Sequence, residues 1–228
     1  MSGVAPDDYA VAPDGSPVAF YRRLAVMGEP ELIHAAIPGG ASVLDLGCGP
    51  GRIAGPLANL GHAVTGVDNG DGMIAALPPS VRGVVADAAT VRLGRLFEVV
   101  LLVSHLVNDP VSGASFAVTA RAHLAPGGLV IGQTYPPGWD PTAGVGTVTR
   151  LGDAEIEMLS AKLTGDVLVA FVRYGVDGVR WEQPFSARLL DEATLGALLA
   201  GAGLALDGWL ERPGWFRAVR ASGSGARD

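Results

Sequence analysis

The sequence predicts an α/β fold: a doubly wound, seven-stranded, mostly parallel sheet with an antiparallel β insertion before the last helix. Two observations predict it. Over the first two-thirds of the 228 residues, apolar strand-like runs alternate with helical runs, which is typical of a parallel sheet covered by helices on both faces. After the proline-rich loop that begins at Pro136, three runs instead alternate with a period of two, and hairpin turns separate them.

The first part of the chain is expected to alternate helices and strands. Two short amphipathic helices, at 16–27 and 29–37, follow an N-terminal loop at 1–15. Five apolar strands of a buried sheet are expected at 42–46, 63–67, 82–86, 97–103 and 129–134. The helices between them are expected at 51–60, 71–77 and 112–123.

The second part is expected to hold the insertion and the end of the sheet. The insertion has strands at 154–163, 167–174 and 179–189. Asp191 can cap a helix over 192–202, and two last strands follow at 205–210 and 215–220. The chain then divides into a helical cap (1–40), a core (41–135), a loop with the antiparallel meander (136–190), the last helix with two strands (191–221) and a tail expected to be disordered (222–228). The meander is expected to cover the site or to pair two subunits, so a monomer and a homodimer both stay open.

Composition excludes several classes of function. Hydrophobic residues make up 49% of the chain, which supplies a core and opposes extended disorder. The apolar runs are far shorter than the ~20 residues of a spanning helix, and the start shows no signal peptide. The net charge of −7 opposes a broad nucleic-acid surface, and the single Cys48 suits a reducing compartment. We therefore expect a cytoplasmic protein without nucleic-acid or membrane partners.

The most informative segment is VLDLGCGPGR, residues 43–52, where a strand runs into three glycines at alternate positions and a helix begins directly after them. Glycine lets a ligand lie against the backbone, and a helix start offers free N–H groups to a carboxylate or phosphate. Asp45, inside an apolar strand, is costly to bury unless a cation or a donor engages it. Two ligands fit: residues 49–54 match the dinucleotide pattern G-x-G-x-x-A, whereas a zwitterionic amino acid would also account for Asp45.

This segment resembles motif I of the class I S-adenosylmethionine-dependent methyltransferases. Residues 64–68 resemble the second motif, whose acid, here Asp68, holds the ribose hydroxyls. In the continuation of that motif, Met73 would lie on adenine, and Gly70 stands where the family usually has Ser.

The remaining family motifs follow in order. Residues 84–88 resemble the third motif, whose acid, here Asp87, accepts a hydrogen bond from the adenine amino group. Residues 97–101 resemble the fourth motif, with Glu98 where Asp is common, and residues 124–129 resemble the fifth. The similarity spans roughly residues 40–135.

The resemblance implies a Rossmann-like methyltransferase fold, with S-adenosyl-L-methionine as cofactor and S-adenosyl-L-homocysteine as product. It also implies in-line transfer of the methyl group to a small organic acceptor. Because strands of an open α/β sheet end at one rim, the groups that bind the cofactor should meet there. They are expected to be Asp45, Gly47, Cys48, Gly49, Gly51, Asp68, Asn69, Met73, Asp87, Ala88, Ser104 and Tyr21. We interpret the Cys48 side chain as a small apolar filler and not as a nucleophile.

His105, which follows the fourth strand, is the candidate general base because imidazole titrates near neutral pH. A positioning or packing role is the alternative. His34, His62 and His123 are expected to be solvated or packed. No metal is expected, since Ser104 and His105 stand where acidic ligands would be needed.

Substrate selection is expected to depend on aromatic residues outside the shared core, with core packing as the alternative role for several of them. They are Tyr9, Phe20, Tyr21, Tyr135, Trp139, Phe171 and Trp181. A tyrosine of the helical cap (Tyr9 or Tyr21) and Arg52 are candidates to reach the cofactor carboxylate. Two rival functions remain open: a binding or regulatory module that keeps the pocket without turnover, and a nicotinamide oxidoreductase, which Asp45 disfavours.

Overall fold

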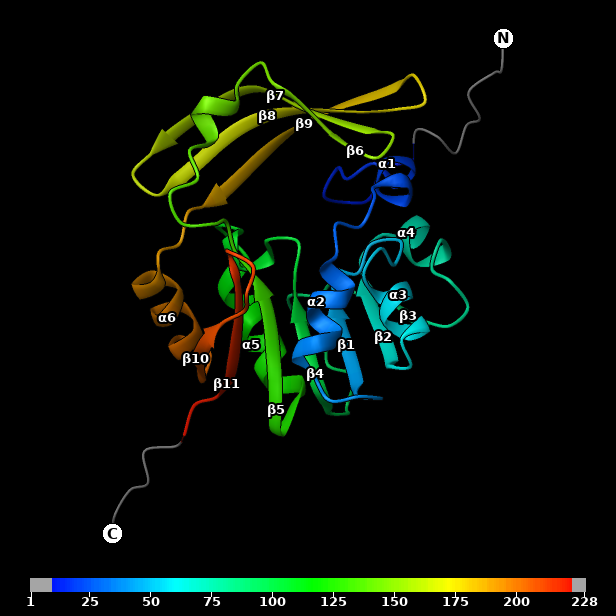
Figure 1. Ribbon diagram of the computed structural model, residues 1–228, viewed down its shortest axis with the longest axis vertical. Helices are drawn as coiled ribbons and strands as arrows, with labels where there is room; N and C mark the ends of the chain where they lie inside the picture. The colour runs from blue at the N-terminus through cyan, green and yellow to red at the C-terminus, as the bar shows by residue number, and fades with distance from the viewer. Residues whose placement is uncertain (1–9, 223–228) are drawn as a thin grey trace.

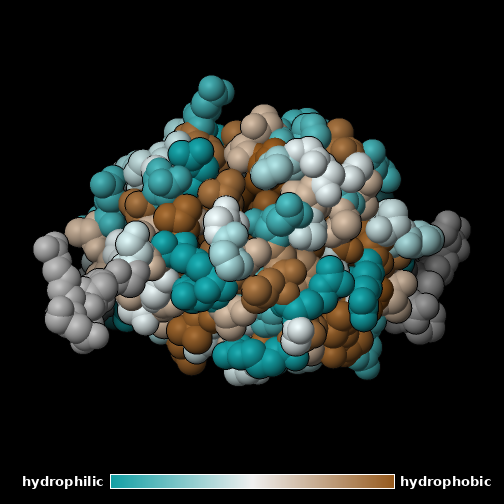
Figure 2. Space-filling view, turned by 90° about the horizontal axis from the view of Figure 1, so that it is seen from below, coloured by the Kyte–Doolittle hydropathy of each residue, from teal (hydrophilic) through white to brown (hydrophobic). Residues whose placement is uncertain are grey.

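Two β-sheets organise the protein, one mostly parallel and one antiparallel. The computed structural model describes residues 10–222, so Tyr9 and the tail from residue 223 lie outside the described residues. The antiparallel sheet lies above the end of the larger sheet at which the parallel strands terminate (Figure 1). The face at the other end shows polar and apolar side chains intermixed (Figure 2). Within residues 10–222, no helix has the length and apolar character needed to cross a bilayer.

The larger sheet has the predicted doubly wound topology. Its seven strands lie in the order β10-β11-β5-β4-β1-β2-β3. They are β1 (Ser42–Leu46), β2 (Ala63–Asp68), β3 (Arg82–Val85), β4 (Phe97–Leu102), β5 (Leu124–Gln133), β10 (Leu204–Trp209) and β11 (Trp215–Arg220). β11 is antiparallel to both of its neighbours, and the other pairs are parallel. Because strand order reverses between β1 and β4, the crevice outside their carboxyl ends is where this fold binds ligands.

Helices cover both faces of this sheet because successive side chains of a strand point to opposite faces. The α-helices are α1 (Val18–Arg23), α2 (Glu29–Ala36), α3 (Ala54–Asn59), α4 (Asp71–Ala75), α5 (Gly113–His123) and α6 (Glu192–Gly201). Val43 and Leu101 pack in one core with α2 and α3, whereas Leu44 and Leu102 pack in another with α5 and α6. All four of these side chains are fully buried, so two cores fix the strand ends that carry the site.

The antiparallel insertion is confirmed, with one strand more than expected. It has the order β6-β7-β8-β9. Its strands are β6 (Val148–Leu151), β7 (Ala154–Thr164), β8 (Val167–Val176) and β9 (Val179–Arg188). The sequence pattern missed β6 because this short strand is mostly exposed and shows no apolar alternation. β8 packs on α1, where the ring centroids of Tyr174 and Phe20 are 4.6 Å apart. The insertion therefore covers the helical cap at the carboxyl-end rim.

Three elements differ from the prediction by three residues or more at one end, and the other differences are smaller. The first helix covers residues 18–23 and not 16–27, because the chain is extended on either side of it. α3 begins at Ala54 and not at Gly51, because Gly51 is held in the left-handed region at a φ of +87°. β5 begins at Leu124 and not at residue 129, because its ladder with β4 includes Leu124 before the register shifts.

Candidate active site

The turn between β1 and α3 places three glycines in the left-handed region. Gly47, Gly49 and Gly51 have φ values of +66°, +53° and +87°. A Cβ atom on Gly49 would meet no atom within 4 Å, so the backbone there is open to a ligand. A Cβ atom on Gly51 would lie 2.8 Å from the Leu77 side chain, and one on Gly47 would lie 3.3 Å from Leu106. The positive φ and the packing against Leu77 together account for the glycine at position 51, and its expected contact with the cofactor stays a prediction.

Asp45 is a buried carboxyl group without a hydrogen-bond partner among the described residues. Its side chain is 1% exposed. Burial raises the pKa of Asp45 to about 7; the positive charge of Arg52 opposes this effect, and the negative charge of Asp68 adds to it. Because an unpaired buried carboxylate is costly, a ligand that brings a cation and N–H donors would stabilise this group.

Asp68 ends β2 beside the turn and stabilises it. Its Oδ2 accepts a hydrogen bond from the backbone N–H of Gly49 at 2.9 Å, and its Oδ1 accepts one from Gly70 at 2.9 Å. Each carboxylate oxygen keeps a second lone pair, so Asp68 can also accept from a hydroxyl of a ligand. The structure thus brings this acid to the open part of the turn, as the sequence predicts. The neighbouring Asn69 is exposed.

The N-terminal cap packs on the segment that follows β2. A Cβ atom on Gly70 would lie 3.0 Å from the Cβ of Ala12, which explains why this chain lacks the family's usual serine. Met73 is 3% exposed and packs with Ala12, Val18 and Tyr21. Little of the Met73 side chain is therefore exposed, and its contact with adenine stays a prediction.

Asp87 lies at the same edge of the sheet, after β3, and is exposed. Its oxygens accept hydrogen bonds from the Ala89 amide at 2.8 Å and the Thr90 hydroxyl at 3.0 Å. Its carboxylate stabilises the local turn, so its contact with adenine stays a prediction. Ala88 is buried in the core.

The Cys48 side chain is a packing group of the turn. A Cβ atom on Gly66 would lie 2.6 Å from its Sγ, so the thiol fills the space that this glycine leaves on β2. Burial raises the pKa of the thiol, which keeps it protonated at neutral pH. Both facts agree with an apolar filler and oppose a nucleophile.

His105 begins an aromatic column beside the turn. Ser104 and His105 have φ values of +55° and +63°, a left-handed pair held by the surrounding structure. The His105 ring stacks on Tyr135 with 4.1 Å between centroids, and Tyr135 stacks on Trp139 at 4.3 Å. Burial, and then the charge of Arg52, lower the pKa of His105 to about 4. The imidazole is therefore neutral at pH 7 and can accept a hydrogen bond; its Nδ1 is buried without a partner among the described residues.

Two polar groups near the site, Glu29 and Tyr174, were not predicted. Arg52 donates from Nη1 to Oε1 of Glu29 at 2.8 Å. Tyr174 of β8 lies beside Tyr21 of α1, with 6.3 Å between the ring centroids, and burial raises the pKa of both phenols. The alternation of β8 could have placed Tyr174 on the inner face of the insertion. An acid at a helix start is too common for Glu29 to have been singled out.

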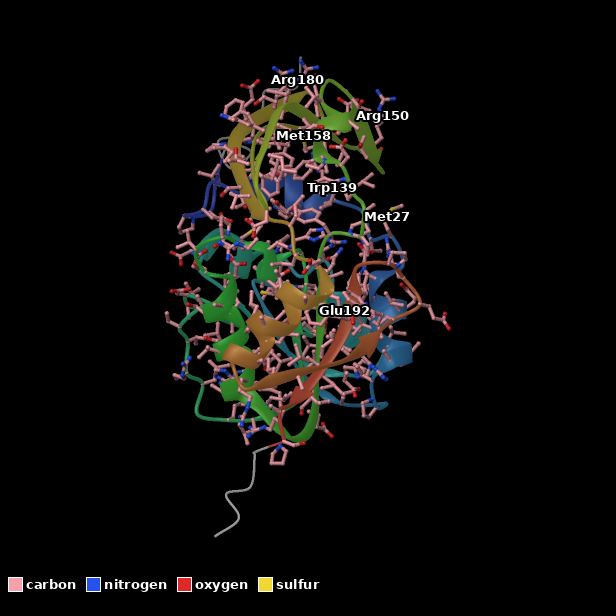
Figure 3. The ribbon with its side chains drawn as sticks, turned by 90° about the vertical axis from the view of Figure 1, so that its left-hand side faces the viewer. Met27, Trp139, Arg150, Met158, Arg180 and Glu192 are labelled. Carbon is pink, nitrogen blue, oxygen red and sulfur yellow. The ribbon has the colours of Figure 1, made fainter. Side chains whose placement is uncertain are left out.

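A cavity of about 590 Å³ lies on the far side of the aromatic column. Tyr135 and Trp139 line it together with the start of α6 and the β10–β11 hairpin, which contributes Trp209 and Arg212. Trp139 lies between the antiparallel sheet and the core (Figure 3). The cavity is thus aromatic on two sides and separated from His105 by the Tyr135 ring.

The other aromatic candidates have different surroundings. Phe171 is 38% exposed, because it alternates in β8 with the buried Ala170 and Val172, so its expected place in the acceptor pocket is wrong. Phe20 is fully buried and packs on the insertion. Trp181 of β9 has a buried Nε1 without a partner in the described part of the chain.

The remaining histidines are packed, as expected. Nδ1 of His34 and Nε2 of His62 are 2.8 Å apart, and His123 accepts a hydrogen bond from the Leu93 amide at 3.0 Å. Between residues 10 and 222, no three His, Cys, Asp or Glu side chains gather as metal ligands would.

Comparison with known proteins points to one family. The methyltransferase domain family matches residues 43–128. A ubiquinone biosynthesis O-methyltransferase from Methylobacterium nodulans is 34% identical over 154 residues, which cover 55% of this chain and 57% of that protein. One from Paramagnetospirillum magneticum is 36% identical over 126 residues, 51% of this chain and 50% of that protein. The chain therefore spans about half the length of the curated relatives it matches.

Solved structures share the fold over most of the chain. An S-adenosylmethionine-bound amino pentose methyltransferase from Micromonospora echinaspora has a TM-score of 0.65 and 26% identity, covering 84% of this chain and 88% of that one. The CcbJ methyltransferase from Streptomyces caelestis has a TM-score of 0.69 and 23% identity, covering 86% and 90%. Residues 43–128 thus match a methyltransferase domain, and the motifs, strand order and glycine turn of this chain are similar to those of the class I S-adenosylmethionine-dependent methyltransferases.

Proposed function

We propose that this protein transfers a methyl group from S-adenosyl-L-methionine to a small organic acceptor by in-line displacement. The observation that carries the proposal is Asp45, a buried carboxylate without a partner beside an open glycine turn. A ligand with an ammonium group satisfies it, whereas a dinucleotide phosphate would be repelled. The curated relatives are O-methyltransferases, and the amino pentose enzyme was solved with S-adenosylmethionine, which supports the same cofactor here.

The proposed cofactor site consists of groups at the carboxyl ends of the parallel strands. Asp45 would hold the ammonium group, the open backbone at Gly49 would lie along the ligand, and Asp68 would accept from the ribose hydroxyls. Asp87 and Met73 are the proposed neighbours of adenine. When bound, S-adenosylmethionine supplies a methyl group on a sulfonium, and loss of that positive charge in the transition state favours a dry pocket.

The acceptor site is proposed to lie on the His105 side. The neutral imidazole can accept a hydrogen bond from an acceptor hydroxyl or amine, which both orients the nucleophile and receives its proton. The aromatic cavity of about 590 Å³ has the size of a small-molecule site, but the Tyr135 ring separates it from His105, so it does not itself place an acceptor on the imidazole. The curated relatives are named for O-methylation, whereas the amino pentose enzyme is named for an amino sugar, so both oxygen and nitrogen acceptors should be screened.

The cellular location, the partners and the oligomeric state of this protein remain predictions. Composition predicts a cytoplasmic protein that uses neither nucleic acid nor a membrane as its partner. The insertion leaves a monomer and a homodimer open, and light scattering of the purified protein distinguishes them.

Two measurements test the proposed function. Calorimetric titration with S-adenosylhomocysteine and with NAD should show binding of the first alone, weakened in Asp68→Ala. Incubation with methyl-labelled S-adenosylmethionine and a panel of phenols, alcohols and amines should then label an acceptor. Binding of S-adenosylhomocysteine without any label transfer would favour the alternative, a non-catalytic binding or regulatory module; binding of NAD alone would contradict both.

A further inference from the structure

The proposed reaction does not use the cavity of about 590 Å³ that lies beyond the aromatic column. The stacked rings of Tyr135 and Trp139 form part of its lining, and the Tyr135 ring separates it from His105. Trp209 and Leu210 of the β10–β11 hairpin also line it, together with prolines of the neighbouring loops. Its volume is in the range of small-molecule sites, and aromatic side chains favour a planar, apolar ring.

Arg212 is a half-buried cation that lines this cavity. Its Nη1 donates to the backbone oxygen of Met27 at 2.9 Å, which fixes the guanidinium between the hairpin and the segment before α2. Nε and Nη2 of Arg212 make no hydrogen bond within residues 10–222. These two nitrogens form one side of the planar guanidinium, which can bind a carboxylate through two parallel N–H···O bonds.

Two acids at the start of α6 also line the cavity, but each already accepts hydrogen bonds from the protein. Asp191 accepts from the amide and the hydroxyl of Thr194 at 2.8 and 2.6 Å. Glu192 accepts from Nε1 of Trp209 at 3.1 Å. Both acids are exposed, so water and salt screen their charges more than the charge of the half-buried Arg212. The free N–H groups of Arg212 therefore favour an anionic group on the ligand.

We propose that this cavity is a second ligand site, separate from the position of methyl transfer, and that it binds planar aromatic carboxylates. The ring would lie against Trp139 and Trp209, and the carboxylate would accept hydrogen bonds from Nε and Nη2 of Arg212. No covalent bond is made or broken. The inference does not rest on the proposed function, because none of the groups assigned to the cofactor lines this cavity.

The test compares three probes that share one ring system: 2-naphthoate, 2-naphthalenemethanol and 2-naphthylmethylammonium. Calorimetry with the wild-type protein, with and without saturating S-adenosylhomocysteine, should show one naphthoate bound per chain with a Kd of at most about 1 mM. Naphthoate should bind about tenfold more tightly than the alcohol, the lower end of the range for hydrogen bonds to a charged group, because the site is partly open to water. The ammonium probe should bind more weakly than the alcohol.

Two variants locate the probe. Arg212→Met removes the guanidinium, so naphthoate should bind no more tightly than the alcohol, whose affinity should stay within about threefold of its wild-type value. The matched control is Arg180→Met, which changes an exposed arginine of β9 outside the cavity and should keep the tenfold ratio of affinities.

Because Arg212→Met also loses the hydrogen bond to Met27, a second variant tests the cavity with Arg212 in place. Leu189→Trp puts a larger side chain into the lining and should block both naphthoate and the alcohol. A cooperative urea transition of each variant shows that it is folded.

The contrary outcomes are distinct from those that bear on the proposed function. The site is refuted if naphthoate does not bind the wild type at about 5 mM, or if Leu189→Trp binds it as the wild type does. Equal affinities for naphthoate and the alcohol, or tighter binding of the ammonium probe, overturn the selection of carboxylates by Arg212. Loss of naphthoate binding with S-adenosylhomocysteine present, or methylation of naphthoate, overturns a separate site. Binding of naphthoate by a protein that does not bind S-adenosylhomocysteine supports this inference and contradicts the proposed function.

Discussion

The most instructive perturbation is Asp45→Asn, which replaces the buried, titratable carboxyl group by a neutral amide with little change of shape. Burial raises the pKa of Asp45 from 3.8 to about 7, so the folded protein keeps a proton that the unfolded chain loses. Between these pH values the folded state binds more protons, and the stability of the wild type must fall as pH rises. A shift of about 3 units corresponds to about 4 kcal/mol at most. The Asp45→Asn variant has no carboxyl group at this position, so its unfolding free energy does not fall with pH for this reason.

The assay is urea unfolding of both proteins without ligand, followed by tryptophan fluorescence from pH 4 to pH 8. The difference in unfolding free energy should move in favour of Asp45→Asn by up to about 4 kcal/mol across this range. Asp153→Asn, in an exposed hairpin turn, should show no such change relative to the wild type. With S-adenosylhomocysteine present, the wild type should become the more stable of the two proteins, because only the Asp45 carboxylate attracts the ammonium group of the ligand. A difference that does not vary with pH would refute the reasoning.

Three further predictions concern the turn, the column and the insertion. Asp68→Ala removes the group that accepts hydrogen bonds from the Gly49 and Gly70 amides. Calorimetry should show that the variant binds S-adenosylhomocysteine at least about tenfold more weakly than the wild type, and an unchanged affinity would contradict this prediction. His105→Ala should abolish turnover of the screened acceptor and leave the affinity for S-adenosylhomocysteine within about twofold of the wild type. Because burial lowers the pKa of His105 to about 4, the rate of the wild-type enzyme should not fall between pH 8 and pH 6. A steep loss of rate in that range would contradict a neutral imidazole. Asn108 bonds the Thr134 hydroxyl at 3.0 Å and the backbone oxygen that ends β9 at 2.8 Å, so Asn108→Ala should cost about 1–3 kcal/mol in urea unfolding, and a loss below about 0.5 kcal/mol would show that the bridge contributes little.

Much of the core could be predicted because its signals are local. β1 and β11 have the expected bounds, since each is a short apolar run between turn residues. The cap of α6 was also predicted, and Asp191 accepts the Thr194 amide at 2.8 Å. The elements that were predicted wrongly or missed depend on contacts between residues that are far apart in the sequence. The start of β5 is set by its ladder with β4, and β6 exists only because it pairs with β7.

In the candidate site, too, residues within local motifs could be predicted, whereas residues that depend on contacts between distant segments could not. Asp45 and Asp68 were predicted because motif spacing fixes their places on the rim. Glu29 and Tyr174 were missed because they reach the site only when the cap and the insertion fold over the core. The close packing of Met73 under Ala12 could not be predicted, since no local pattern links residues so far apart.

A crystal structure with S-adenosylhomocysteine tests the central claim most directly. We predict that the amino acid end lies between β1 and α3, with its nitrogen within hydrogen-bond distance of the Asp45 carboxylate and with the ribose on Asp68. Density for the nucleoside in another cavity, or the reverse orientation in this one, would contradict it.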